Sequence, residues 1–268
     1  MVSRTSEAPS SEPAAFYDAM WNQYASFDAI SPAAFHRRRM MVELVRRFAP
    51  SAQAVLDVGC GTGALMRELA RELPAARIIG ADVSLVSIES SQRQRPDFET
   101  FQMDLSDADF EEHHALRRAQ YDLLTCSEVL EHIADDTQAV RRLRSLLRPG
   151  GHLIASVPGG KMSRFDERIG HHRHYDREQF RRLLSESRFE LRTVIAWGFP
   201  FHNLYRSAVR LASRATWSEP AEPSKRTPGL QPWLGAAYHA FSGLLKPLYY
   251  LNQSFWGEQL FAVGQRPD

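Results

Sequence analysis

The sequence predicts a doubly wound α/β fold: a mostly parallel, seven-stranded sheet with helices on both faces, an antiparallel last strand and helical lid elements. Two observations support this prediction. Short apolar runs alternate with amphipathic helical segments over residues 51–196, as in right-handed βαβ units. The first of these runs leads directly into a glycine-rich turn, which is where such sheets bind ligands.

The strands are expected where apolar runs are bounded by turn residues. These runs cover residues 54–58, 77–82, 98–105, 121–126, 152–157, 189–196 and 259–264. Helical spacing of apolar residues predicts the intervening helices, which lie around residues 65–73, 84–94, 139–147 and 176–184. In the last of these, Asp176 is an expected N-cap with Gln179 three residues later, which is a capping-box pattern.

The pattern divides the chain into five segments. Residues 1–15 are rich in Ser, Glu, Pro and Ala and are expected to be a disordered tail. Residues 16–50 form an N-terminal helical cap, and residues 51–196 form the ligand-binding core. Residues 197–256 are an aromatic helical insertion with a Pro-rich loop, and residues 257–268 carry the final strand of the core sheet.

Composition narrows the class of protein. The 268 residues are 43% hydrophobic and 24% charged, as in an ordinary globular chain. The formal net charge of +1 provides no general attraction to nucleic acid, so no nucleic-acid partner is expected. The only two cysteines, Cys60 and Cys126, predict reduced packing residues and favour a cytoplasmic location.

The glycine-rich turn contains Gly59, Gly61 and Gly63, which let the backbone bend tightly and let a ligand approach main-chain N–H groups. Nicotinamide dehydrogenases and P-loop enzymes also use glycine turns. Here, however, Asp57 lies two residues before the first glycine. A carboxylate there repels a pyrophosphate and suits an ammonium or sulfonium group. The turn therefore favours a cationic ligand.

Two further acids end neighbouring strands. Asp82 ends the second expected strand, where an acid can bind the two hydroxyls of a ribose. Asp104 ends the third and could accept from an adenine amino group. The alternative for either acid is that it caps the following helix.

Five segments, in this order along the chain, resemble the motifs of class I S-adenosylmethionine-dependent methyltransferases. They are residues 55–63, 81–84, 103–105, 121–132 and 147–151. The resemblance covers residues 35–189 and implies an enzyme with S-adenosylmethionine as its cofactor.

The resemblance also implies the cofactor-binding residues. They are Asp57, Gly59, Gly61, Gly63, Asp82, Val83, Asp104, Leu105 and Ser127. Gly59 and Gly61 would face the methionine moiety, with Asp57 directed through their loop toward the ammonium. Asp82 would hold the ribose and Asp104 the adenine.

The densest ionisable cluster is residues 170–175, which resembles a Gly-His-x-Arg-x-Tyr segment of many small-molecule methyltransferases. His171 or His172 is expected to line the acceptor pocket and to act as a general base, because imidazole titrates near neutral pH. The alternative is a polar loop that orders the next helix.

A metal site is the alternative interpretation of a second cluster. Glu128, Glu131 and His132 would share one face of a helix and, with His171, could bind Mg²⁺ or Mn²⁺. The arrangement resembles sites in quinone-pathway O-methyltransferases and small-RNA 2′-O-methyltransferases. A Leu-Glu-His segment also occurs in relatives without a metal, where it caps a helix, and the metal-free interpretation is favoured.

Aromatic residues concentrated in residues 16–27 and 197–256 predict a lid and an apolar or aromatic acceptor, unless they are ordinary helix core. The favoured function is methylation of a small molecule, on oxygen. The alternatives are a nucleic-acid methyltransferase and a catalytically silent scaffold that binds S-adenosylmethionine. The apolar segment 244–250 could also rest on a membrane surface as a peripheral contact.

Overall fold

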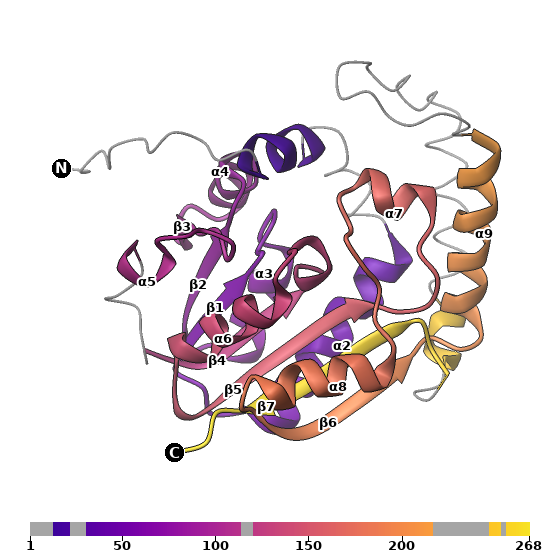
Figure 1. Cartoon of the computed structure of the whole chain (residues 1–268). Coiled ribbons are helices and arrows are strands. Elements are labelled where there is room, and N and C mark those ends of the chain that lie inside the picture. Colours follow the sequence, from indigo (N-terminus) through magenta and orange to yellow (C-terminus); the bar gives the residue numbers. More distant parts are fainter. Residues whose placement is uncertain (1–12, 22–30, 114–119, 217–246, 253–255) are drawn as a thin grey trace.

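A seven-stranded sheet forms the centre of the computed structural model, which describes residues 13–21, 31–113, 120–216, 247–252 and 256–268 (Figure 1). The strands are β1 (Ala54–Val58), β2 (Arg77–Asp82), β3 (Glu99–Gln102), β4 (Tyr121–Ser127), β5 (Leu147–Pro158), β6 (Glu190–Trp197) and β7 (Gln259–Gln265). Their order is β3-β2-β1-β4-β5-β7-β6.

The strand directions confirm the predicted fold class. Strand β1 pairs in parallel with β2 and β4, whereas β7 lies antiparallel between β5 and β6. The strand order reverses between β1 and β4. In open α/β sheets, ligands bind beyond the carboxyl ends of the strands at this reversal.

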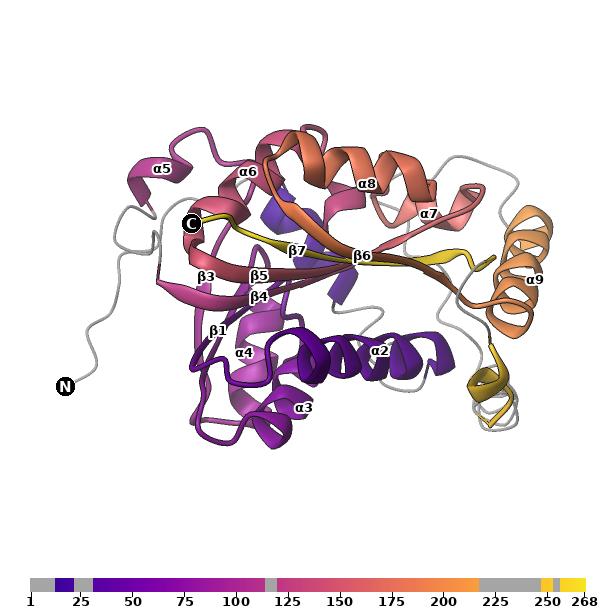
Figure 2. The ribbon, with the colours of Figure 1, turned by 90° about the horizontal axis from the view of Figure 1, so that it is seen from below.

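The helices cover both faces of the sheet. They are residues 13–21, α2 (Pro32–Phe48), α3 (Ala64–Glu72), α4 (Leu85–Gln94), α5 (Phe110–His113), α6 (Asp136–Leu146), α7 (Arg164–Arg168), α8 (Arg177–Glu186) and α9 (Phe201–Thr216), with 3-10 turns η2 (Leu130–His132) and η3 (Tyr249–Leu251). Figure 2 shows α2, α3 and α4 on one face and α6 and α8 on the other.

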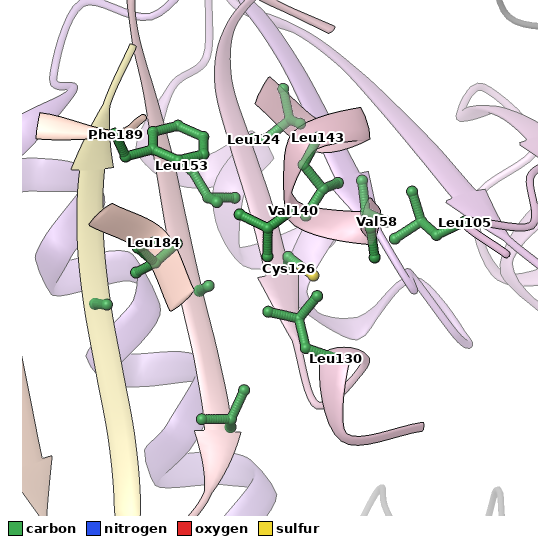
Figure 3. Close-up of a cluster of buried hydrophobic side chains, with 14 of the residues drawn as sticks. Val58, Leu105, Leu124, Cys126, Leu130, Val140, Leu143, Leu153, Leu184 and Phe189 are labelled. Carbon is green, nitrogen blue, oxygen red and sulfur yellow. The ribbon is translucent and has the colours of Figure 1, made fainter. Parts of the chain in front are cut away.

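Both faces of the central strands are buried. On one face, Val140 and Leu143 of α6 pack against Leu124 and Cys126 of β4 (Figure 3). On the other face, Leu123 packs with apolar residues of α2 and α3. A strand covered on both faces needs a nearly continuous apolar run, and this explains why β4 lacks the polar alternation of a surface strand.

The two thiols are free and buried, as predicted. Cys60 belongs to the apolar cluster under α2 and α3, and Cys126 belongs to the cluster under α6. They therefore pack on different faces of the sheet.

Some element boundaries differ from the sequence-based expectation. Strand β3 ends at Gln102, so Asp104 and Leu105 lie in the loop that follows it. Helix 13–21 begins inside the segment predicted as a tail. Helix α2 begins after Ser31, whose hydroxyl accepts from the Ala34 N–H at 3.3 Å.

Several predictions fall outside the described residues. They concern residues 1–12 of the expected tail, Tyr24, Phe27, and residues 217–246, which include the Pro-rich loop and part of segment 244–250. Within the described part of the chain, no helix is both long and apolar enough to cross a bilayer.

The capping box predicted for α8 is present and gives a stability prediction. Asp176 Oδ1 accepts from the Gln179 N–H at 2.7 Å, and Gln179 Oε1 accepts from the Asp176 N–H at 2.8 Å. Asp176→Ala is expected to lower the free energy of unfolding by about 1 kcal/mol, measured by urea denaturation. The exposed neighbour Glu178→Ala is the control, with a loss of at most about 0.5 kcal/mol. Equal stability of the Asp176 variant and the wild type would contradict the assignment.

Candidate cofactor and acceptor site

The loop after β1 requires its glycines. Gly59, Gly61 and Gly63 all have positive φ angles, of 71°, 52° and 72°. A Cβ atom at Gly59 would lie 2.2 Å from Cγ2 of Val129. The loop is also fixed to β2, because the Gly59 N–H donates to the Ala81 carbonyl at 2.8 Å. Side chains are thereby excluded at these three positions, and the backbone there can contact a ligand.

Asp82 joins this loop to the end of β2. Its Oδ2 accepts from the Gly61 N–H at 2.8 Å, and its Oδ1 accepts from the Ser84 N–H at 2.9 Å. Burial raises the pKa of Asp82, while these two hydrogen bonds lower it. The N-cap of α4 is Ser84 and not Asp82. The carboxylate is therefore not used as a helix cap and lies directly against the glycine loop.

Asp57 is buried beneath the same loop. It is 2% exposed, and its Oδ1 accepts from the Thr125 hydroxyl at 2.7 Å. Burial, together with the nearby negative charge of Asp82, raises the pKa of Asp57 to about 7. A cation bound at the loop would stabilise the ionised carboxylate.

The remaining predicted cofactor residues lie at the same edge of the sheet but also have structural partners. Asp104 Oδ1 accepts from the backbone and the hydroxyl of Ser106 at 2.7 and 2.5 Å. The Leu105 side chain is buried in the core, and the Val83 carbonyl accepts from Gln102 at 2.9 Å. The Ser127 and Ser156 hydroxyls are 2.8 Å apart.

The structure separates the two histidines that were equivalent in the sequence. His172 is exposed, whereas His171 is half-buried. His171 Nδ1 lies 3.1 Å from Nε2 of His174, and its ring meets the His132 ring edge-on at 4.5 Å between centroids. Burial lowers the pKa of His171 to about 2, with the neighbouring imidazoles contributing. His171 is therefore a neutral imidazole within a histidine cluster.

Two other residues of the 170–175 segment make structural contacts. Arg173 Nη1 lies 2.7 Å from Oδ2 of Asp136, and the same carboxylate oxygen accepts from the Tyr175 hydroxyl at 2.8 Å. The Tyr175 hydroxyl also donates to the Leu130 carbonyl at 3.2 Å. These contacts hold the loop against η2 and α6, and His171 is positioned by them.

The prediction that Glu128, Glu131 and His132 share one face of a helix is wrong. Glu128 has a φ of 59°, outside the helical region, and the helix that follows spans only Leu130–His132. Glu128 Oε1 accepts from the Gln259 side chain at 2.8 Å, and Oε2 lies 3.5 Å from Arg37. Glu128 is itself the left-handed residue after β4, and its side chain therefore does not share a helical face with Glu131 and His132.

Three of the four alternative ligands nevertheless meet. Glu131, His132 and His171 each offer one ligand atom, and these atoms lie within 4.8 Å of one another. Glu131 is fully buried, and neither of its carboxylate oxygens has a hydrogen-bond partner among the described residues. Burial raises its pKa and lowers that of His132 to about 4. A carboxylate and two neutral imidazoles could hold a divalent cation.

Sequence reasoning missed two charged residues of this cluster. Asp166 is 1% exposed, lies 3.7 Å from His174 Nε2 and pairs with Arg206 of α9 at 3.3 Å. The spacing of Ser163 and Asp166, which form the capping box of α7, was a signal for the acid. No local pattern indicated Arg206, because it belongs to the insertion.

The fold and this site define the protein as a class I S-adenosylmethionine-dependent methyltransferase with a Rossmann-like domain. The features are the glycine loop after β1, the buried acids beside it and the antiparallel β7 near the sheet edge. The chain belongs to a methyltransferase-domain family, whose model matches residues 33–194.

Similar curated proteins include the ubiquinone biosynthesis O-methyltransferases of Escherichia coli O139:H28 and Shigella boydii serotype 18, both 37% identical over 103 residues. This match covers 38% of the chain and 42% of the length of each relative. The matched stretch is therefore less than half of either relative.

Solved structures share the fold. A chain from the complex between the Haloferax volcanii Trm112 methyltransferase activator and a methyltransferase is 14% identical, with a TM-score of 0.59 over 92% of this chain and 97% of that chain. Haemonchus contortus phosphoethanolamine N-methyltransferase 2 in complex with S-adenosylmethionine is 18% identical, with a TM-score of 0.55 over 86% of this chain and 53% of that chain.

Proposed function

We propose that the protein transfers the methyl group of S-adenosylmethionine to an oxygen of a small apolar or aromatic acceptor. The observation that carries this proposal is the position of Tyr17 between the two halves of the site. Its ring meets His132 edge-on at 5.4 Å between centroids. Burial raises the pKa of the Tyr17 hydroxyl, and Glu131, Asp104 and Asp82 raise it further. The histidine cluster is therefore adjacent to the acids assigned to the cofactor.

The cofactor would lie along the carboxyl edge of the sheet. In this proposal the glycine loop and Ser127 face the methionine portion, Asp57 stabilises its ammonium through the loop, and Asp82 holds the ribose hydroxyls. Asp104 with Val83 and Leu105 flanks the adenine. The buried acids support a ligand that brings positive charge, because each is disfavoured as an uncompensated anion.

The acceptor chemistry is an in-line displacement. The acceptor oxygen forms a bond to the methyl carbon while the carbon–sulfur bond breaks, and the sulfur leaves with the electron pair as neutral S-adenosylhomocysteine. The hydroxyl proton of the acceptor passes to a base. We assign that base to His171, because it lies in the histidine cluster next to His132 and His174, whereas His172 is exposed.

The names of the curated relatives support oxygen as the methylated atom, since they are O-methyltransferases. The shared stretch includes only part of those proteins, so the acceptor here is proposed from the site. Tyr17 and Phe16 add aromatic surface beside His132 and Gly170. An acceptor with an apolar ring and a hydroxyl group fits such surroundings.

The test is a transfer assay from methyl-labelled S-adenosylmethionine to a small-molecule cell extract, followed by mass analysis of the labelled products. The expected product is an O-methylated apolar or aromatic molecule. His171→Ala is expected to lower kcat about 100-fold without weakening cofactor binding, and His172→Ala is the matched control with near-wild-type turnover.

Three results would contradict parts of this proposal. Label recovered in RNA or in no product would reject the small-molecule assignment. Unchanged turnover of the His171 variant would reject the base. Loss of turnover on exhaustive chelation, with recovery on addition of Mg²⁺ or Mn²⁺, would reject His171 as the base. It would indicate instead that Glu131, His132 and His171 bind a metal ion.

A further inference from the structure

Helix 13–21 contacts both halves of the proposed site, although it precedes the matched domain in the sequence. It is the unlabelled indigo helix beside α4 in Figure 1. Its contacts reach the loop after β1, the N-terminus of α4, η2 and the loop that carries His171. One short helix therefore crosses the edge of the sheet where the strands end.

The helix is fastened by Asp18. Asp18 Oδ1 accepts from the Ser84 hydroxyl at 2.5 Å and from the Val86 N–H at 3.2 Å. The Ser84 hydroxyl also caps α4 by accepting from the Ser87 N–H at 3.2 Å. A carboxylate at the N-terminus of a helix is favoured by the exposed N–H groups and the helix dipole. The same Ser84 donates its backbone N–H to Asp82.

Trp21 covers the glycine loop. A Cβ atom built at Gly61 would lie 2.7 Å from the ring carbons Cζ2 and Cη2 of Trp21. The edge of the indole's six-membered ring therefore lies directly against Gly61, whose N–H donates to Asp82. Any ligand that binds along this backbone must meet the indole.

The other end of the helix covers the histidine loop. Tyr17 contacts the His132 ring, and a Cβ atom at Gly170 would lie 3.0 Å from the Phe16 ring. Gly170 immediately precedes His171. The helix thus spans the distance between the residues proposed for the cofactor and the residue proposed as the base.

We propose that helix 13–21 is a lid on this site, latched to α4 by Asp18, and that its Trp21 is a binding residue for the sulfonium end of the cofactor. The inference rests on the proposed function. An indole attracts a sulfonium cation through its ring electrons and lacks this attraction for a neutral thioether. Trp21 would then favour S-adenosylmethionine over its product, and the latch would set how fast either leaves.

The first experiment is calorimetric titration of the full chain with S-adenosylmethionine and with S-adenosylhomocysteine. Trp21→Leu is expected to weaken binding of S-adenosylmethionine about tenfold and to weaken S-adenosylhomocysteine binding clearly less. Trp256→Leu is the control, because Trp256 is 70% exposed and is not part of the site. Equal weakening of both ligands, or no weakening, would overturn the role of Trp21.

The second experiment tests the latch. Asp18→Asn is expected to raise the dissociation rate constants of both ligands about tenfold in stopped-flow measurements, with Glu43→Gln, an exposed acid of α2, unchanged. Hydrogen exchange of amides 13–21 should slow on cofactor binding in the wild type and slow less in Asp18→Asn. Unchanged exchange in the wild type with cofactor bound would overturn the lid. Absence of cofactor binding by the wild type would instead reject the proposed function.

Discussion

Asp82→Asn is expected to weaken S-adenosylmethionine binding about 100-fold in calorimetric titrations. Both oxygens of Asp82 accept backbone N–H groups, one from Gly61 and one from Ser84. An asparagine has only one acceptor oxygen, so its amide nitrogen would face one of these donors. In the proposed site the ribose hydroxyls also donate to this carboxylate. Hydrogen bonds to a charged group contribute about 1.5–3 kcal/mol, so losing one from the ribose corresponds to an effect of this size.

Asp122→Asn is the matched control for this substitution. Asp122 Oδ2 also accepts from two backbone N–H groups, those of Gln53 and Ala54, both at 2.9 Å. Asp122 lies near the start of β4, whereas the proposed site lies beyond the carboxyl ends of the strands. Its substitution is expected to lower stability and to leave cofactor affinity unchanged. Equal cofactor affinity of the Asp82 variant and the wild type would contradict the ribose assignment.

Asp57→Asn is expected to make the unliganded protein more stable at pH 8 while weakening S-adenosylmethionine binding. Burial raises the pKa of Asp57 from 3.8 to about 7. The stabilisation from this protonated acid is complete below pH 3.8 and is lost as the pH rises through 7. Ionising the buried acid therefore costs roughly 4 kcal/mol at pH 8. Asparagine avoids this cost and can still accept from Thr125.

Urea denaturation between pH 4 and pH 8 measures this effect. The wild type should lose stability across this range, and Asp57→Asn should lose clearly less. Cofactor binding to the wild type near pH 6 should also release a proton, because the bound cation favours the ionised carboxylate. Titrations in buffers of different ionisation enthalpy detect that proton. The electrostatic role of Asp57 would be contradicted if the free energy of unfolding changed equally with pH in the wild type and in Asp57→Asn, and if both proteins released the same number of protons on cofactor binding.

The order of strands and helices was predictable because each central strand is a short apolar run that both faces of the sheet bury. The expected boundaries of β5 were less accurate. The strand was expected over residues 152–157, because Pro149, Gly150 and Gly151 are typical turn residues, yet β5 begins at Leu147. The pairing of Leu147 with Tyr121 of β4 and the hydrogen bond from Gly150 to Arg266 extend the strand. Such contacts between distant residues override a local turn signal.

The placement of Asp57 and Asp82 beside the glycine loop was predictable for a similar reason. Asp57 and Asp82 follow from strand ends and the glycine spacing, which are local features of the sequence. The metal alternative failed at Glu128, because spacing alone does not reveal a left-handed residue that interrupts a helix. Helical periodicity holds only where the backbone is helical.

The acceptor side depends on contacts that the sequence does not display. His171 and His172 are neighbours in an irregular loop, and only packing against His132 distinguishes them. Asp18 and Ser84 are separated by 66 residues and meet only after the chain folds. The latch of the proposed lid and the proposed choice of base therefore required the structure.

The central claim is that the carboxyl edge of β1, β2 and β4 binds a positively charged sulfonium nucleoside. Calorimetric titration of the folded wild-type chain with S-adenosylmethionine tests it most directly, with folding verified by circular dichroism. We expect one cofactor per chain, displaced by S-adenosylhomocysteine and not by a nicotinamide dinucleotide. A folded protein that takes up neither S-adenosylmethionine nor S-adenosylhomocysteine would contradict the claim.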